Sequence, residues 1–178
     1  HRRPAELLAW WNPSGGGCHN VTVGHLLTQT GSLATYRLGI AQCTADSTIG
    51  CARQAYEEAC TPRPLGSKFQ YAETNWHVLG AIAMQVTGMT TYNAVFRKYL
   101  GDPLGMSKSC VFDYRGVARA DPGGGARCSA LDYARFLQAA LRGKIVPKRL
   151  WRLAELPQTM QLDAGRTMYA PFEYGIGQ

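Results

Sequence analysis

The sequence predicts a mostly α-helical fold, built as a single domain over residues 1–178. Apolar residues recur at helical spacing in several stretches that begin or end at capping residues, glycines or prolines, whereas extended patterns are short. The hydrophobic content of 46% and the charged content of 17% are typical of a folded chain with its own core. This composition excludes an intrinsically disordered protein.

The first elements along the chain are expected to be short. Residues 1–20 form a leader segment, with at most one turn of helix at Ala5–Trp11 and a glycine-rich loop at Asn12–Gly17. Thr22 is placed to cap a short helix that follows it, because its hydroxyl can accept from a free amide of the first turn. His25 lies on that helix, and we interpret it as a packing residue because a lone helical histidine is seldom a ligand.

Six cysteines point to disulfide bonds. An even number of cysteines in a chain of this size fits an oxidising compartment, and none forms the Cys-x-x-Cys spacing of a zinc site. We expect at least two disulfides, a secreted or otherwise oxidised location, and no metal or cofactor. Half of the cysteines lie in or at the edge of a segment, residues 34–63, that resembles a stapled loop with one helix at about Ile49–Ala59. The pairing is left open among Cys18, Cys43, Cys51, Cys60, Cys110 and Cys128.

The longest apolar helix is expected at Thr74–Thr87, with Thr74 as its N-cap and Gly88 as the left-handed residue that ends it. Its apolar residues cover more than one face, which predicts the most buried element of the fold; they are Trp76, Val78, Leu79, Ala81, Ile82, Ala83, Met84 and Val86. A second helix is expected at about Thr91–Leu100, ended by Gly101 and Asp102-Pro103. Its apolar stripe is Tyr92, Val95, Phe96, Tyr99 and Leu100.

The elements after residue 106 are predicted from shorter signals. Residues 107–127 read as loop, with a short strand at Val111-Phe112 and a tight turn series at Asp121–Gly125. Ser129 and Asp132 have the spacing of a capping box at the start of an amphipathic helix that Gly143 ends. A last helix is expected at Pro147–Leu156, packing Leu150, Trp151 and Leu153, and residues 168–178 read as extended.

Tyr71 is the candidate functional residue of the central stretch. It stands just before a helix N-terminus, where backbone amides and the helix dipole favour negative charge, so a tyrosine there can pass a proton. The alternative is an ordinary half-buried tyrosine, which is the commoner case for this residue type.

Three blocks of the sequence resemble the class C type of the serine β-lactamase, penicillin-binding-protein and esterase superfamily. The block at 64–106 carries Tyr-Ala-Glu-Thr-Asn-Trp, Val-Thr-Gly and Pro-Leu-Gly-Met, close to the family's Tyr-Ser-Asn-Thr-Asn-Tyr, Val-Thr-Gly and Pro-Leu-Gly-Met. The block at 21–33 is similar to its Ile-Thr-Ile-Arg-His-Leu-Leu-Thr-His-Thr-Ser-Gly-Leu, and the block at 123–141 to its Gly-Gly-Leu and Asp-Leu-Ala-Arg-Phe segments. The blocks stand in the family's order.

The resemblance implies a fold, an activity and a site. The fold would be the helical domain of the β-lactamase/DD-peptidase-like fold over 21–156, with 157–178 as a return segment towards the family's sheet. The family forms an acyl-enzyme on a serine that stands three residues before a lysine, and the tyrosine of the Tyr-x-Asn motif shares their proton relay. Tyr71 occupies that tyrosine position as general base or relay, and Glu73 occupies the position of the motif's asparagine.

The sequence also departs from the family. No serine has a lysine three residues later, and no Lys-Thr-Gly or His-Thr/Ser-Gly occurs. Glu73 can accept from an ammonium group but, when ionised, cannot donate to a substrate carbonyl as asparagine does. Because the chain begins with His1 rather than methionine, we expect a processed product or a piece of a longer protein, inactive alone.

The formal charge of +7 raises the question of a nucleic-acid partner, but the basic residues carry no recognised binding motif. The densest group reads as a solvated face; it comprises Arg142, Lys144, Lys148, Arg149 and Arg152. No apolar run is long enough to cross a bilayer. The family resemblance implies a small-molecule or peptide substrate if flanking segments are present, and the oligomeric state stays open.

Besides a basic nucleic-acid-binding domain, two interpretations of function remain open from the sequence. The first is a portion of a β-lactamase-related serine hydrolase that cleaves amides or esters, with Tyr71 as its resident catalytic residue. The second is a non-catalytic module that keeps the fold without the nucleophile, for binding or for structure. The fold alone does not separate them, because function depends on the site.

Overall fold

The computed structural model describes residues 2–11, 18–31, 33, 43–60, 64–113 and 119–158, and the predicted loop at Asn12–Gly17 and extended segment at 168–178 lie outside them. Over the described ranges the chain is mostly helical, as the sequence predicts, with a single two-stranded sheet. In chain order the elements are the 3-10 helix η1 (Pro4–Glu6), α1 (Val23–Leu27), α2 (Thr48–Ala59), α3 (Glu73–Thr87), α4 (Tyr92–Phe96), the π-helix η3 (Arg97–Gly101), β1 (Val111–Phe112), β2 (Ala126–Arg127), α5 (Ala130–Leu141) and α6 (Lys148–Glu155).

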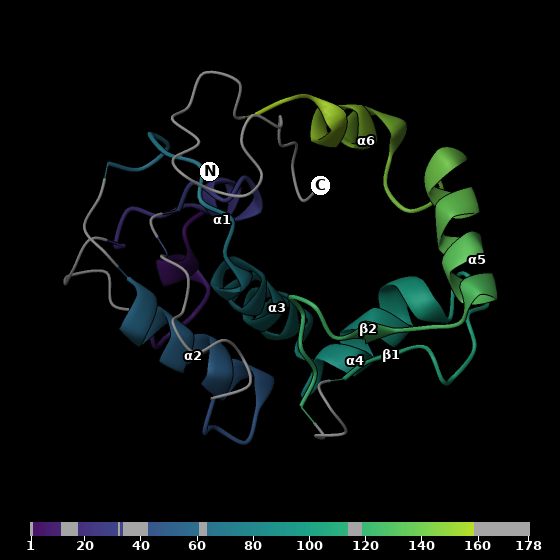
Figure 1. Cartoon of the computed structure of the whole chain (residues 1–178), viewed down its shortest axis with the longest axis horizontal. Helices are drawn as coiled ribbons and strands as arrows, with labels where there is room; N and C mark the ends of the chain where they lie inside the picture. Colours follow the sequence, from purple (N-terminus) through teal and green to yellow (C-terminus); the bar gives the residue numbers. More distant parts are fainter. Residues whose placement is uncertain are drawn as a thin grey trace.

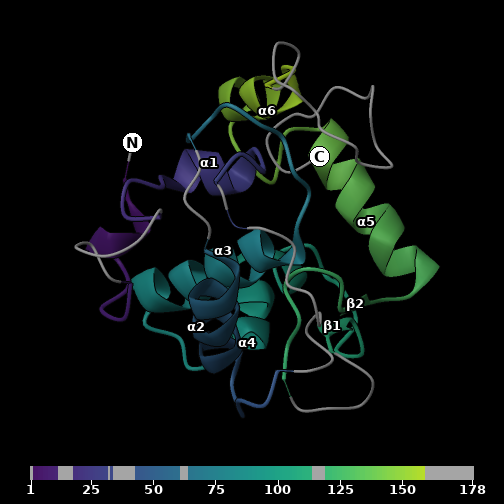
Figure 2. The same ribbon diagram turned by 60° about the vertical axis from the view of Figure 1, so that its left-hand side comes forward.

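Helix α3 lies at the centre of the fold. It contacts α1, α2 and α4, while α5 and α6 lie at the right and top of the view, away from α2 (Figure 1). The turned view shows α2 crossing in front of α3 and α4 beside them (Figure 2). The main core forms where these helices meet, and its buried members include Trp11, Leu26, Leu33, Tyr56, Val78, Ala81 and Ile82. Of the described helices, α3 has the longest run of buried residues, although Val86 at its end is 60% exposed.

The N-terminus of α3 differs from the prediction. The helix begins at Glu73, its N-cap is Ala72, and no side chain caps it. Thr74 lies inside the first turn with its hydroxyl buried and without a partner among the described residues. The amide of Ala72 donates instead to the side chain of Gln29, at 3.0 Å. The predicted cap at Thr74 was therefore wrong, because the helix begins one residue earlier and no side chain accepts from the amides of its first turn.

Replacing Thr74 by valine tests this correction. Valine keeps the shape and removes a buried hydroxyl, so Thr74→Val should leave the free energy of unfolding unchanged or raise it by about 1 kcal/mol. Thr91→Val is the matched control, because the Thr91 hydroxyl accepts from the amide of Ala94 at 3.2 Å and caps α4. The control should lose about 1 kcal/mol in urea unfolding. If Thr74→Val lowered the free energy of unfolding more than Thr91→Val does, the Thr74 hydroxyl would be acting as a cap.

The predicted second helix forms, but its last turn is wound as a π-helix. The helix begins where expected, with Thr91 as its N-cap, and η3 continues it to Gly101. The wider turn shifts the side chains that follow Phe96, so that Tyr99 is 57% exposed and does not belong to the apolar stripe. Lys98 lies over the Tyr99 ring, 5.5 Å from its centre, which gives the exposed ring a cationic neighbour.

The predicted strand at Val111-Phe112 is confirmed. Val111-Phe112 forms β1 and pairs antiparallel with Ala126-Arg127, with Val111 opposite Arg127 and Phe112 opposite Ala126.

The predicted cap of α1 is also confirmed. The Thr22 hydroxyl accepts from the amide of His25 at 3.1 Å, while the His25 ring accepts from the amide of Thr22 at 3.2 Å. His25 therefore completes a capping box, in agreement with a structural role.

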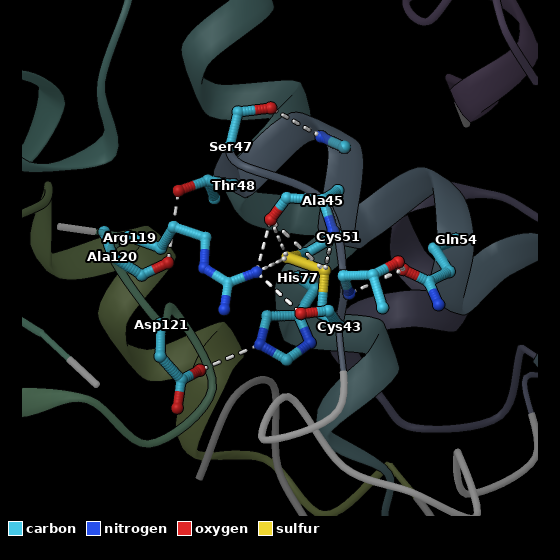
Figure 3. The surroundings of a disulfide bond; sticks show 12 residues. Cys43, Ala45, Ser47, Thr48, Cys51, Gln54, His77, Arg119, Ala120 and Asp121 are labelled. Atoms are coloured by element: carbon cyan, nitrogen blue, oxygen red, sulfur yellow. Dashed lines mark hydrogen bonds and ion pairs between the residues drawn. A yellow bond between two sulfur atoms is a disulfide. The ribbon is translucent and has the colours of Figure 1, made fainter. Parts of the chain in front are cut away.

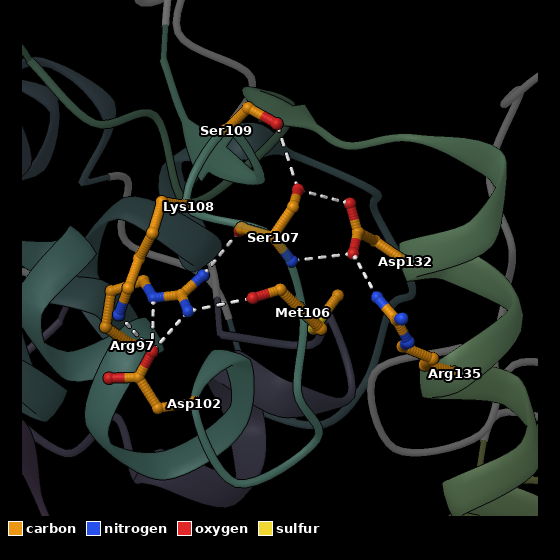
Figure 4. A network of polar contacts seen from close by, with 8 residues as sticks. All are labelled: Arg97, Asp102, Met106, Ser107, Lys108, Ser109, Asp132 and Arg135. Carbon is orange, nitrogen blue, oxygen red and sulfur yellow. Dashed lines mark hydrogen bonds and ion pairs between the residues drawn. The ribbon is translucent and has the colours of Figure 1, made fainter.

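Ser129 caps α5, and the Asp132 carboxylate links this helix to the loop after η3 (Figure 4). The Ser129 hydroxyl accepts from the amide of Asp132 at 3.1 Å. Ser107 donates to Asp132 from its hydroxyl at 2.6 Å and from its amide at 2.7 Å, and the carboxylate is fully buried. These hydrogen bonds, led by the Ser107 hydroxyl, lower the pKa of Asp132. The predicted capping box thus also serves as a tertiary anchor.

Helices α5 and α6 bury less than their patterns predict. Ala139 and Ala140 are buried on α5, and Phe136 packs against the core cluster of Phe96, Met106 and Cys110. The other large apolar residues of α5 are exposed, and α6 has no buried residue at all. The expected packing of Leu150, Trp151 and Leu153 is therefore not found, because no described element covers that side of α6. The exposed apolar residues are Leu131, Tyr133, Leu137, Leu141, Leu150, Leu153 and Leu156.

All six cysteines are paired, which confirms the prediction of at least two disulfides. The pairs are Cys18–Cys60, Cys43–Cys51 and Cys110–Cys128. The first joins the leader segment to the end of α2 across 42 residues of chain. Closing a loop of that length can contribute about 4 kcal/mol through the unfolded state. Three disulfides suggest an oxidising compartment.

Candidate functional site around Tyr71

Both chain neighbours of Tyr71 are tied to one buried residue. Gln29 accepts from the amide of Gln70 at 3.0 Å through its backbone carbonyl, and from the amide of Ala72 at 3.0 Å through its side chain. The same side-chain oxygen accepts from the Asn75 amide group at 2.6 Å. Because the three bonds meet on Gln29, the backbone on either side of Tyr71 is held at two points. The Tyr71 side chain itself is partly exposed at the start of α3.

Gln29 adopts an uncommon backbone conformation to make these bonds. Its φ angle is 59°, in the left-handed region, and its side chain is only 1% exposed. Non-glycine residues in this region are uncommon and deserve an explanation. Here the conformation turns both the carbonyl and the side chain of Gln29 towards the strand-like segment before α3. Gly66 extends the same contact, since its amide donates to the carbonyl of Thr30 at 3.2 Å.

Three buried side-chain polar atoms of the residues around the start of α3 have no partner among the described residues. They are Nε2 of Gln29, the hydroxyl of Thr74 and Oδ1 of Asn75. Each such atom costs about 1–3 kcal/mol relative to one that is hydrogen-bonded. Each unpaired buried polar group needs an explanation, such as an ordered water or a functional role. The side chains buried at the start of α3 are therefore partly polar.

A turn from the second half of the chain runs along α3. Glu73, His77 and Gly80 share one face of the helix, at the spacing of successive turns. A methyl group on Gly80 would lie 2.5 Å from Cγ of Pro122, and one on Gly123 would lie 3.4 Å from Cβ of Glu73. The turn therefore needs a glycine on the helix for its close approach. This contact places the glycine turn beside Glu73, which is exposed at the first position of α3.

A buried hydrogen bond between His77 and Asp121 fixes that turn. Nε2 of His77 donates to Oδ1 of Asp121 at 2.8 Å, and the two side chains are 3% and 4% exposed. Burial alone would raise the pKa of Asp121, but hydrogen bonds from His77 and from the amides of Gly123 and Gly124 outweigh it and lower that pKa. Burial, together with the Asp121 charge, also raises the pKa of Tyr92.

The segment before Asp121 is held by the loop of a disulfide (Figure 3). Arg119 donates to the carbonyl of Cys43 at 2.8 Å and also to the carbonyl of Ala45. One guanidinium nitrogen lies 3.4 Å from Sγ of Cys51. The Thr48 hydroxyl donates to the carbonyl of Ala120 at 3.1 Å. The start of α2 and its disulfide thus position the chain that enters the glycine turn.

Tyr71 and Glu73 are the candidate proton-transfer groups, and the described residues hold no serine with a lysine three residues later. Tyr71 supplies a phenol and Glu73 a carboxylate, two residues apart at one helix N-terminus.

No cluster of three or more His, Cys, Asp or Glu side chains suited to a metal ion occurs among the residues the structure places. None of the described helices is long and apolar enough to span a membrane.

The sequence names Tyr71, Glu73 and the glycine turn as candidates, but it does not predict the residues that hold them in place. Gln29 could have been noticed in the sequence, because it replaces the second histidine of the family pattern quoted above. His77 and Asp121 gave none, since a histidine and an aspartate 44 residues apart have no local pattern that joins them. Their pairing becomes visible only when the turn is docked on α3.

Comparison with known proteins places this arrangement in one family. The family model described as Beta-lactamase matches residues 5–178. No sequence among the curated proteins matches the chain.

Solved structures agree on the fold. A "putative beta-lactamase" from Bacteroides dorei DSM 17855 superposes with a TM-score of 0.79 at 18% identity, covering 98% of this chain and 56% of that one. A penicillin binding protein from Bacillus halodurans gives 0.69 at 16% identity, covering 99% and 60%. EstCE1, a hydrolase with promiscuous acyltransferase activity, gives 0.69 at 19% identity, covering 98% and 60%. The chain thus spans between 56% and 60% of the length of these three proteins.

Proposed function

Because the chain belongs to the Beta-lactamase family, we propose that it forms the helical part of a serine hydrolase that cleaves amides or esters through an acyl-enzyme. The observation that carries the proposal is the placement of Tyr71 at the start of α3, with both neighbours tied to Gln29. A proton-transfer group must be held within a few tenths of an ångström of its working position, and such anchoring supplies that precision.

In the proposed reaction Tyr71 relays a proton. The serine oxygen bonds to the acyl carbon of the substrate while its proton passes to the Tyr71 oxygen, and the Tyr71 proton moves on to the neighbouring lysine amine. The relay then runs in reverse to protonate the leaving group as the bond to it breaks. This division of labour is general acid–base catalysis of a nucleophile by adjacent groups. The serine and lysine would come from a Ser-x-x-Lys pair, which these 178 residues do not contain.

Glu73 distinguishes this chain from relatives with asparagine at that position. An ionised carboxylate accepts hydrogen bonds only, so Glu73 suits contact with the lysine ammonium better than donation to a substrate carbonyl. We therefore favour ester or peptide substrates over β-lactams. Secretion is part of the same proposal, because three disulfides are stable in an extracytoplasmic setting.

A non-catalytic module is the second candidate. The observation that favours it is the absence of a Ser-x-x-Lys pair within residues 1–178, joined to the exchange of asparagine for Glu73. In that case the Tyr71 segment would be kept for a binding surface, and no acyl-enzyme would form.

Covalent labelling separates the two candidates. The 178-residue chain and the protein with its natural flanking sequence would each be treated with a fluorescent serine-directed probe and mapped by peptide mass spectrometry. We expect no label on the chain alone, and one label on the longer protein, at a serine followed three residues later by lysine. Stoichiometric labelling of the chain alone would contradict the proposal that the serine nucleophile is not among these 178 residues. A longer protein that is folded yet unlabelled would favour the non-catalytic module.

A further inference from the structure

Helix α6 carries its apolar and its basic residues on opposite sides, which no other described helix does. At 100° per residue, Leu150, Leu153 and Trp151 occupy one side of the helix, and Arg149, Arg152 and Lys148 occupy the other. The apolar side is therefore continuous, and the polar side is basic. This is the residue pattern of helices that lie flat in the interface of a lipid bilayer.

Both sides of α6 are accessible. None of its residues is buried, and the exposed fractions are 42% for Leu150 and 48% for Leu153. Its one acid, Glu155, accepts from the indole nitrogen of Trp151 at 2.7 Å. That bond orients the acid along the helix towards the tryptophan, so the charge presented by the polar side is positive.

The end of α5 adds to the same surface. Gly143 has φ of 63°, and the amides of Gly143 and Lys144 donate to the carbonyls of Ala140 and Ala139 at 2.9 and 2.8 Å, which closes the helix as a Schellman motif. A methyl group on Gly143 would lie 2.8 Å from Cγ of Lys148, so the first residue of α6 packs over this glycine. The turn thereby sets the C-terminus of α5 beside α6, where the views agree (Figures 1 and 2).

We call these residues the α6 patch. Its basic members are all exposed and are opposed by one acid over residues 141–156. Its leucines are exposed by 42–87%. The patch comprises Leu141, Arg142, Lys144, Lys148, Arg149, Leu150, Trp151, Arg152, Leu153 and Leu156.

We propose that the α6 patch docks on the surface of a membrane that contains anionic phospholipids. The basic side chains complement the negative headgroups, and the leucines and Trp151 enter the boundary between headgroups and acyl chains. A nucleic acid would also attract the charges, but it would leave the leucines in water, so the combination favours lipid. The proposal concerns a surface contact, and it does not depend on the proposed hydrolase activity.

Vesicle binding by the 178-residue chain tests the proposal. The chain would be mixed with vesicles of phosphatidylcholine alone or of phosphatidylcholine with phosphatidylglycerol, and bound protein measured by co-sedimentation. We expect binding to the anionic vesicles only, weakened by added salt. Tryptophan emission should shift to shorter wavelength on binding, and Trp151→Phe should remove that shift while the protein still sediments.

Two pairs of substitutions separate the charges from the apolar side. Arg149→Gln with Arg152→Gln should weaken binding by roughly fivefold for each charge removed. Leu150→Gln with Leu153→Gln should weaken it by about tenfold or more at unchanged charge. The controls are Arg53→Gln with Lys98→Gln for charge and Leu131→Gln, 61% exposed on the first turn of α5, for apolar surface. Circular dichroism of each variant checks its fold, and both controls should bind as the parent does.

Three results would overturn the proposal. The first is equal binding to both kinds of vesicle, and the second is a leucine pair that binds anionic vesicles as the parent does. The third is tight binding of a fluorescent DNA duplex that survives the leucine substitutions while vesicles are not bound. That outcome would assign the patch to nucleic acid instead.

Discussion

Val78→Asp is expected to abolish folding. Val78 is fully buried at the centre of α3, in the cluster where α1, α2 and α3 meet. An aspartate there would place an unpaired carboxylate, or its protonated form without a partner, in an apolar environment. Such a change costs more than about 4 kcal/mol, a large part of the roughly 5–15 kcal/mol that holds a typical domain together.

The same helix offers the control. Val86→Asp introduces the same group on α3, but Val86 is 60% exposed, so the melting temperature should change by only a few degrees. Circular dichroism against temperature, at one pH for both variants, gives the comparison. If Val78→Asp melted as close to the parent as Val86→Asp does, the central position of α3 would be wrong.

The helices could be predicted because their signals are local. Thr22, Thr91 and Ser129 each accept from a backbone amide at the start of the helix that the sequence assigns to them. Apolar spacing then gave the lengths of α2, α3 and α5 to within a residue or two. These features depend on residues a few positions apart, which a single sequence displays in full.

The supports of the candidate site could not be predicted because they are contacts between distant segments. Gln29 reaches across 43 residues of sequence to accept from the amide of Ala72, just before α3. His77 meets Asp121 across 44 residues. In each case a tertiary contact overrides or supplements the local pattern, and only the docked chain reveals it. The sequence names candidate residues, and the structure shows which contacts hold the backbone around them.

For helices α5 and α6 the sequence predicts more burial than the structure shows. Their apolar periodicity predicts burial, but periodicity reports only that one side is apolar. It does not identify the partner that covers it. Leu137 and Leu150 remain 43% and 42% exposed, and the basic residues beside α6 suggest the lipid partner proposed above. An apolar stripe is therefore evidence for a contact, which need not be one with the protein's own core.

Tyr71→Phe carries the second large expected effect. The substitution removes only the phenolic oxygen, and the bonds from Gln29 to the backbone of Gln70 and Ala72 stay in place. If Tyr71 relays the proton of the serine nucleophile, acylation should slow by about 10²- to 10⁴-fold, the usual contribution of a positioned acid–base group. Tyr99→Phe is the matched control, because Tyr99 is 57% exposed on η3 and lies outside the proposed site.

The acylation rate of the protein with its natural flanking sequence is the most direct test of the proposed site. It would be followed as the time course of covalent labelling for the parent, Tyr71→Phe and Tyr99→Phe, with melting temperatures recorded for each. We expect Tyr99→Phe to label at the parent rate and Tyr71→Phe to label at least about a hundredfold more slowly, at unchanged melting temperature. A Tyr71→Phe variant that labels as fast as the parent would contradict the role of Tyr71 as the proton relay.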